Sequence, residues 1–186
     1  MEVGRRSVRI LATKRLHLRE MTLDDQDKLL EIFSDPVAMR YYPGTMGRGE
    51  AVAWIERARA SYAAHGIGFW IVERKLDQRF LGQCGLILQD VDGRRETEVA
   101  YLFARANWGQ GYATEAARAC RDWGFSHLDV PRLVSTIRPE NLPSIRVAER
   151  NGMLLTSSLV KPIGGLHQVY AITREAWARD RAANPY

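Results

Sequence analysis

The sequence predicts a mixed α/β fold of the α+β kind, in a single domain over residues 1–186. Its length and composition support this, because 186 residues with 46% hydrophobic and 26% charged side chains suit a globular chain with one core. The apolar pattern agrees, since its period changes along the chain from helical spacing to alternation and back. The chain shows three successive strands and then an alternation of strands with helices. This order predicts one sheet with both antiparallel and parallel neighbours.

The first third of the chain predicts one strand and two helices. Alternating polarity indicates a half-buried strand over 15–20. The capping-box pattern Thr22-Leu-Asp-Asp25 begins a helix, which ends before Pro36. After a turn-rich segment, apolar side chains at helical spacing predict a second helix from about Val52 to Gly66, where the glycine ends it.

The rest of the chain becomes rich in β-branched and aromatic residues and then alternates between strands and helices. Turns at 76–79 and 91–94 separate three strands of a meander. The predicted elements are, in chain order, strands over 69–72, 80–88 and 98–103, a helix over about 112–127, a strand over 133–138, a helix over 142–151, strands over 153–160 and 167–172, and a short terminal helix.

Charge and composition limit the classes of function. The chain has 27 Lys and Arg against 22 Asp and Glu, a net charge of +5. This excess suits an anionic partner such as a nucleotide cofactor or RNA, or else a solvated arginine-rich surface. Two cysteines and four scattered histidines give no disulfide framework and no metal-ligand pair, so we expect no metal. Without a long apolar run or a secretory signal, we expect no membrane partner and a cytoplasmic protein.

The segment 98–116 contains the strongest functional signal. A predicted strand leads into a loop with Gly109 and Gly111, and the loop opens the long helix. Glycines there permit positive φ, and the unpaired N–H groups of the first helical turn can hold a phosphate. The segment is not a P-loop, because no Gly-Lys-Ser/Thr follows, and Thr114 replaces the third glycine of a dinucleotide-binding motif.

In this setting the chain resembles the GCN5-related N-acetyltransferase (GNAT) family. The family's acetyl-CoA loop, Gln/Arg-x-x-Gly-x-Gly/Ala, corresponds to Trp108-Gly-Gln-Gly-Tyr-Ala113. Trp at the first position is similar to the branch of ribosomal-protein N-terminal acetyltransferases, the RimJ/RimL type. The family's Asn-x-x-Ser element corresponds to Asn141-Leu-Pro-Ser144, and its helix ends at Gly152-Met153. The resemblance covers about residues 13–177.

This resemblance implies a GNAT fold, with a mostly antiparallel mixed sheet that splays between two parallel strands and is flanked by helices. It implies acetyl-CoA as co-substrate and no metal. The pantetheine arm would lie in the splay and the pyrophosphate on main-chain N–H groups of the glycine loop. The implied cofactor-binding residues are Leu102, Phe103, Gly109, Gln110, Gly111, Tyr112, Ala113, Thr114, Asn141 and Ser144.

The resemblance also directs attention to candidate catalytic residues. Glu98 can remove the proton of the amine directly or through water, and Glu96 lies on the same strand face as an alternative. An N–H group near Phe103 could hold the oxyanion. Many family members place a tyrosine general acid seven residues after the motif asparagine, where this chain has Ala148. Ser144 is therefore the first candidate donor to the thiolate, followed by Tyr101 and by solvent.

The expected function is transfer of acetyl from acetyl-CoA to a primary amine by direct attack. A protein N-terminus is the first acceptor class, and small amines, amino acids or amino sugars are alternatives. Other readings are a non-catalytic acyl-CoA-binding module and, with less support, an RNA-binding domain. The chain could be a monomer or a homodimer. Aromatic residues before the motif could line the acceptor site or fill the core, and they are Tyr41, Tyr42, Trp54, Phe69 and Trp70.

Overall fold

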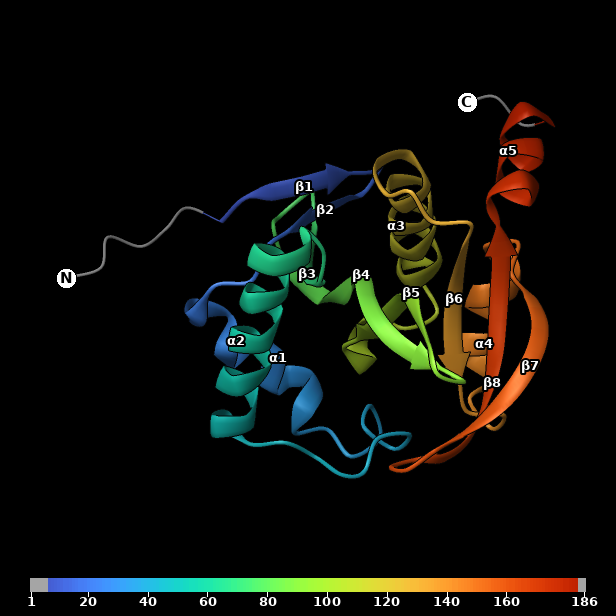
Figure 1. Cartoon of the computed structure of the whole chain (residues 1–186). Coiled ribbons are helices and arrows are strands. Elements are labelled where there is room, and N and C mark those ends of the chain that lie inside the picture. The colour runs from blue at the N-terminus through green and yellow to red at the C-terminus, as the bar shows by residue number, and fades with distance from the viewer. Residues whose placement is uncertain (1–6, 184–186) are drawn as a thin grey trace.

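The computed structural model describes residues 7–183, which form one eight-stranded sheet flanked by helices (Figure 1). The strands are β1 Arg9–Ala12, β2 Leu16–Arg19, β3 Phe69–Arg74, β4 Phe80–Val91, β5 Arg94–Phe103, β6 Arg132–Ile137, β7 Leu154–Lys161 and β8 Gly165–Thr173. The helices are η1 Leu23–Asp25, α1 Gln26–Phe33, α2 Arg48–His65, η2 Arg105–Asn107, α3 Tyr112–His127, α4 Leu142–Arg150 and α5 Arg174–Ala183.

The sheet is mixed, as the sequence predicts. Its strand order is β1-β2-β3-β4-β5-β6-β8-β7, and every neighbouring pair is antiparallel except β5 and β6. The observed strand β1 was not among the predicted elements. Its two central residues, Ile10 and Leu11, are adjacent apolar residues with no alternation, and a register irregularity interrupts its pairing with β2.

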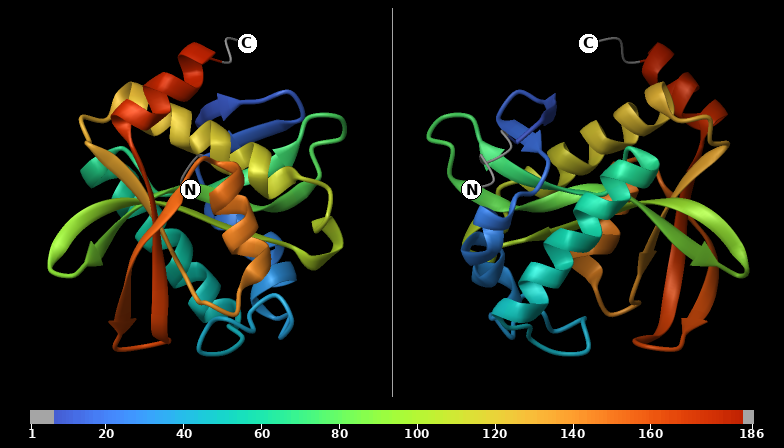
Figure 2. Two further views of the ribbon diagram at one scale, coloured as in Figure 1. Left: turned by 90° about the vertical axis from the view of Figure 1, so that its right-hand side faces the viewer. Right: turned by 60° about the vertical axis from the view of Figure 1, so that its left-hand side comes forward.

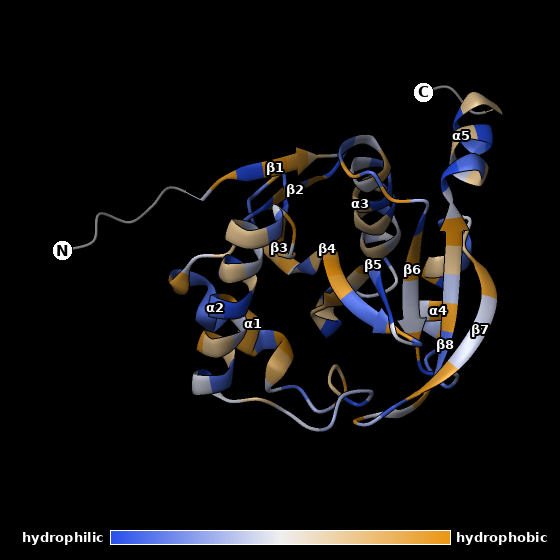
Figure 3. Cartoon of the chain, in the orientation of Figure 1, coloured by the Kyte–Doolittle hydropathy of each residue, from blue (hydrophilic) through white to orange (hydrophobic). Residues whose placement is uncertain are grey.

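Helices cover both faces of the sheet (Figures 1 and 2). Strand residues alternate between two cores: Trp70 and Val72 pack with α3 and α4, whereas Ile71 packs with α1 and α2. The strand β4 leaves these cores at its far end, where its colour in Figure 3 changes from hydrophobic to hydrophilic. Cys84 and Cys120 lie inside one core as free cysteines, with their sulfur atoms 3.5 Å apart.

The expected capping box lies where η1 and α1 begin. The Thr22 N–H donates to Oδ2 of Asp25 over 2.9 Å, and Arg19 donates to both oxygens of the same carboxylate, at 2.6 and 2.8 Å. Burial raises the pKa of Asp25, but the hydrogen bonds from Arg19 and Thr22 and the charge of Lys28 outweigh burial and lower it to about 2. This cluster connects β2 to α1, away from the helix α3.

The two parallel strands separate along their length. β5 and β6 are paired at Glu98 opposite Val134, and the next link is a side-chain bond from Ser135 Oγ to the Val99 carbonyl at 2.7 Å. From there to Phe103, β5 pairs with β4 alone. The sheet therefore has an open internal edge along the last residues of β5.

Candidate active site

The glycine loop and the helix α3 begin where the sequence predicts them. Gly109 and Gly111 have φ of +75° and +77°, and Gly111 is the N-cap residue of α3. A Cβ on Gly109 would meet nothing within 4 Å, and one on Gly111 would meet only Arg15 at 3.5 Å. Backbone conformation, rather than lack of space, is therefore the reason for glycine at both positions.

An arginine from the N-terminal part of the chain holds this loop. Arg15 Nε forms an ion pair of 2.6 Å with Glu115, and Nη1 donates to the Gln110 carbonyl over 3.1 Å. The guanidinium also lies 4.6 Å from the ring centroid of Tyr112. Sequence reasoning missed this contact because Arg15 and Glu115 are 100 residues apart.

Beside the loop lies a cavity of about 510 Å³, which we call the loop groove. Predicted cofactor residues that line it are Leu102, Phe103, Gly109, Gly111, Tyr112, Ala113, Thr114, Asn141 and Ser144. Gln110 is outside the lining, because its side chain donates to the Ala106 carbonyl over 3.3 Å. Three further lining residues are Arg40, Arg146 and Arg150, and among described residues no Asp or Glu lines the groove. The positive charge of these arginines and the N–H groups at the N-terminus of α3 together suit phosphate groups.

The end of β5 directs backbone groups toward this groove. The Ala104 N–H donates to the Leu81 carbonyl on β4, whereas the Phe103 carbonyl accepts from Nε1 of Trp108 over 2.8 Å. Because successive residues of a strand point their N–H and C=O groups to opposite sides, the N–H of Phe103 points away from β4. It faces the open internal edge.

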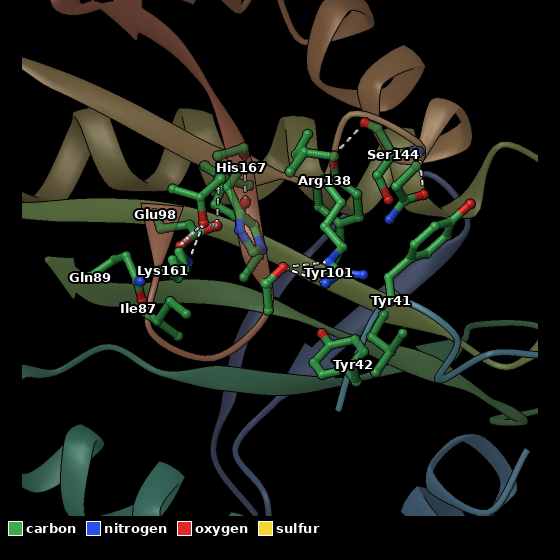
Figure 4. Close-up of a pocket in the computed structure, with 18 of the residues that line it drawn as sticks. Tyr41, Tyr42, Ile87, Gln89, Glu98, Tyr101, Arg138, Ser144, Lys161 and His167 are labelled. Atoms are coloured by element: carbon green, nitrogen blue, oxygen red, sulfur yellow. Dashed lines mark hydrogen bonds between the residues drawn. The ribbon is translucent and has the colours of Figure 1, made fainter. Parts of the chain in front are cut away.

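A second cavity, of about 300 Å³, lies along an earlier part of β5, and we call it the Glu98 cleft (Figure 4). Of the five aromatic residues named from the sequence, Tyr41, Tyr42, Trp54 and Phe69 line it. Trp70 does not, because its side chain is fully buried in the core against Trp123. In Figure 4, Glu98, Lys161 and His167 lie at one end of the cleft, and Tyr41 and Ser144 at the other.

Glu98 is a buried carboxylate, with 6% of its surface exposed. Its Oε1 accepts from the N–H and the hydroxyl of Thr136 at 2.8 and 2.9 Å, and Oε2 has a longer contact of 3.1 Å to that hydroxyl. Burial raises the pKa of Glu98, and the charge of Lys161 and the Thr136 hydrogen bonds oppose this rise in part. Glu96 lies outside the cleft in an ion pair of 2.6 Å with Arg132.

The two cavities share a set of lining residues, so they meet at one place. The shared residues are Ala38, Tyr41, Tyr101, Leu102, Asn141 and Ser144. There the Tyr101 hydroxyl donates to the Ser144 carbonyl over 2.8 Å, and the Ser144 N–H bonds the Asn141 side chain over 3.3 Å. Burial is the main cause that raises the pKa of Tyr101 well above its usual value, and Cys84 and Glu98 add to it. The phenol therefore keeps its proton.

The Glu98 cleft also contains three groups that sequence reasoning did not select, Arg138, Lys161 and His167. His167 Nδ1 lies 2.8 Å from the Gly165 carbonyl, which can only accept, so Nδ1 carries the hydrogen. Burial and the charges of Lys161 and Arg138 lower the pKa of His167, and they outweigh the hydrogen bond to Gly165 and the charge of Glu140, which raise it. The ring is therefore neutral near pH 7, with a lone pair on Nε2.

No group of three or more His, Cys, Asp or Glu among residues 7–183 is arranged to hold a metal ion. None of the helices described here is both long enough and apolar enough to cross a bilayer.

The comparisons with known proteins agree with one another. The family model described as "Acetyltransferase (GNAT) domain" matches residues 15–154. YkkB of Bacillus subtilis strain 168 is 40% identical over 152 residues, which cover 81% of this chain and 88% of YkkB. An acetyltransferase structure from Agrobacterium tumefaciens has a TM-score of 0.76 at 27% identity, covering 92% of this chain and 98% of that one. The Mycobacterium smegmatis RimJ structure, determined with a CoA disulfide, has a TM-score of 0.72 at 24% identity, covering 90% and 88%.

Proposed function

Because the chain belongs to the GNAT family of acetyltransferases, we propose that it transfers acetyl from acetyl-CoA to a primary amine by direct attack. The observation that carries this proposal is the meeting of the two cavities at Tyr101 and Ser144. One cavity offers backbone N–H groups and arginines for phosphates, and the other offers a buried carboxylate for an amine. A thioester at their junction would be within reach of both sides.

In this proposal CoA occupies the loop groove. The pyrophosphate rests on the N–H groups from Gly109 to Thr114, and the Thr114 hydroxyl adds a donor. The arginines of the groove neutralise the phosphate charge. The pantetheine arm pairs with the open edge of β5 at the N–H of Phe103, as an added strand would, whereas Leu102, whose backbone groups face β4, lines the groove.

Glu98 acts as the general base. The ammonium form of the amine loses one proton to Oε2, the less occupied oxygen, and the neutral nitrogen forms a bond to the thioester carbonyl carbon. The carbonyl oxygen becomes an oxyanion, for which the candidate donor is the N–H of Tyr101, two residues before Phe103 on the same open side of β5. The C–S bond then breaks and the second proton of the nitrogen passes to the departing sulfur, which yields the N-acetylated amine and CoA.

Two hydroxyls can serve the departing thiolate. The Ser144 side chain lies at the junction, and the Tyr101 phenol lies beside it with its proton directed at the Ser144 carbonyl. Ala148, in the family's usual tyrosine position, is fully buried and offers no donor. We propose Ser144 first as a hydrogen-bond donor to sulfur, and Tyr101 second, after its proton turns from the Ser144 carbonyl.

The acceptor class is the finer part of the proposal. A protein N-terminal amine is the first class, because of the tryptophan at the start of the loop motif. A cleft of about 300 Å³ is at the small end for ligand sites, so it suits a terminal residue or a small amine equally well.

A product assay tests this function. The protein is incubated with acetyl-CoA and a panel of peptides, amino acids and amino sugars, and mass spectrometry detects acetylated amines while a thiol reagent follows CoA. We expect at least one amine to be acetylated with equal release of CoA. Tight binding of acetyl-CoA without transfer to any amine would contradict the proposal and favour a non-catalytic acyl-CoA-binding module.

A further inference from the structure

The Glu98 cleft has an unbalanced charge. Glu98 is the one acidic side chain in its lining among the described residues, whereas Lys161 and Arg138 are both basic. These two cations bond to neutral oxygens: Lys161 Nζ donates to the Thr136 hydroxyl over 2.8 Å, and Arg138 donates to the Gly164 carbonyl. The lining therefore carries two positive charges against one negative.

The single negative charge of the lining belongs to Glu98, which acts as the general base in the proposed reaction. Thr136 lies between Lys161 and Glu98, so the lysine supports the carboxylate through that hydroxyl rather than by a direct ion pair. An amine that enters the cleft brings its own positive charge to Glu98. With the amine bound there, no other acidic side chain in the lining is left to balance Lys161 and Arg138.

Burial makes this excess costly. Arg138 and Lys161 are half-buried, and the cleft walls include Tyr42, Trp54 and Phe69. Charges in such surroundings are screened less than charges on the surface, so an unmatched pair of cations favours an anion on the ligand. The bonds to the Gly164 carbonyl use Nε and Nη2 of Arg138, so its Nη1 group remains available. This group and the ammonium of Lys161 can donate hydrogen bonds to such an anion.

We propose that the amine acceptor carries an anionic group, a carboxylate or a phosphate, close to its amine, and that Lys161 and Arg138 bind that group. This inference rests on the proposed function and narrows its substrate class. The same excess of positive charge disfavours acceptors with several ammonium groups. His167 is neutral beside the two cations and adds no charge of its own.

Matched pairs of amines test the inference. Phenylalanine and phenylalaninamide differ in a carboxylate, phosphoethanolamine and ethanolamine differ in a phosphate, and the amidated peptides Ser-Asp-Ala and Ser-Asn-Ala differ in an acidic side chain. For each pair we measure the ratio of kcat/KM, anionic over neutral, at saturating acetyl-CoA. We expect a ratio of about tenfold or more in at least one pair, which is the value of one charged hydrogen bond. The pair that responds identifies the kind of anion.

Variants test whether Lys161 and Arg138 cause the preference for the anionic amine. Lys161→Met and Arg138→Gln should each bring the kcat/KM ratio close to one. Arg138→Lys keeps the charge and should retain most of the ratio. Lys75→Met removes an exposed lysine in the turn after β3 and should leave the ratio unchanged. A ratio below about twofold in every pair, or a ratio that neither charge-removing variant lowers, would overturn the inference.

Calorimetry on the CoA-saturated protein separates this inference from the proposed function. We expect the anionic member of a pair to bind more tightly than its neutral partner. Acetylation of both members without any preference would reject the inference and leave the acetyltransferase proposal intact. Preferential binding of the anionic member without acetylation would support the inference and reject the transfer, and equal binding would reject the inference whether or not acetylation occurs.

Discussion

The loop groove and the Glu98 cleft meet along β5, but they are built in different ways. The groove takes most of its candidate ligands from the backbone of one continuous segment, which ends at the N-terminus of α3. The cleft takes side chains from six strands, from α2 and the loop before it, and from the start of α4. A backbone site tolerates changes of side chain as long as the chain can follow the same path. A side-chain site depends on the identity of each residue.

The two cavities also differ in how their charge is arranged. The arginines of the groove have no acidic lining residue among them in the described chain, which suits a ligand with several phosphates. The cleft combines one buried carboxylate with two cations, which suits a ligand that carries both signs. The four experiments below test whether binding of CoA and reaction of the amine separate along this division.

The largest effect is expected at Glu98. Glu98→Gln should lower kcat by roughly 10²- to 10⁴-fold, the usual contribution of a general base, with little change in the KM for acetyl-CoA. Burial raises the pKa of Glu98, so the parent's rate should increase with pH through a value above the usual range of a glutamate. In the variant, this rise of the rate with pH, which reports the titration of Glu98, should disappear. Still higher pH should restore part of the rate, because it neutralises the amine.

Glu96→Gln is the matched control for this prediction. Glu96 lies two residues away in an ion pair with Arg132, outside the cleft, so its loss should leave the pH profile unchanged. If Glu98→Gln keeps the parent's rate and pH limb, the base must be another group, and His167→Gln then becomes the decisive variant.

A second experiment tests the backbone character of the groove. Gly111→Val places a β-branched residue at φ +77°, which costs about 1–3 kcal/mol unless the loop changes its path. We expect acetyl-CoA to bind at least about tenfold more weakly by calorimetry, while the circular dichroism spectrum is retained. Gln110→Ala should have little effect. Equal affinity of Gly111→Val and the parent would remove the support for phosphate binding at this loop.

The junction should give an intermediate effect. Ser144→Ala should lower kcat, and lower it less with an acyl donor whose thiol is more acidic than CoA, because such a thiolate leaves with less help. Tyr101→Phe removes the bond to the Ser144 carbonyl and should reproduce only part of that loss. A rise in the KM for acetyl-CoA with kcat intact would make Ser144 a binding group, with the thiolate leaving unaided.

The smallest effect on CoA binding and acetyl transfer is expected at Asp25, which lines neither the loop groove nor the Glu98 cleft. Asp25→Asn should lower the free energy of unfolding by about 1–2 kcal/mol in urea titrations, with acetyl-CoA affinity unchanged. The folded-state pKa of Asp25 is lowered to about 2, so its contribution is complete above the unfolded value near 4. It should be lost as the pH falls through about 2. A variant as stable as the parent at pH 7 would contradict this.

The contrast between the two cavities also explains what could be predicted from the sequence. The groove's central segment is local: the strand, the positive-φ glycines and the start of α3 follow one another, so short-range rules place them within a few residues. The order of strands and helices along the chain also predicts the mixed sheet. The strand β1 could not be predicted, since its four residues lack alternation and depend on pairing with β2.

The cleft was mostly beyond prediction because its parts meet only after folding. Lys161 approaches Glu98 through Thr136, and the nearest of these residues in sequence are 25 apart. No periodicity in one strand indicates which residue of another strand will lie opposite. Likewise Glu96 and Glu98 are equivalent in an alternation pattern, and only Arg132 on β6 distinguishes them.

The open internal edge of β5 has a consequence for amide hydrogen exchange. A strand in the middle of a sheet normally has its N–H groups bonded on both sides, and such amides exchange slowly. Past Val99, β5 has a partner on one side only, so the amide of Phe103 is as exposed to exchange as one on an outer strand. Deuterium uptake should be fast there in the free protein and slow at Leu102, whose neighbour β4 is present. Binding of CoA should slow exchange at Phe103, because the amides of its arm complete the missing strand.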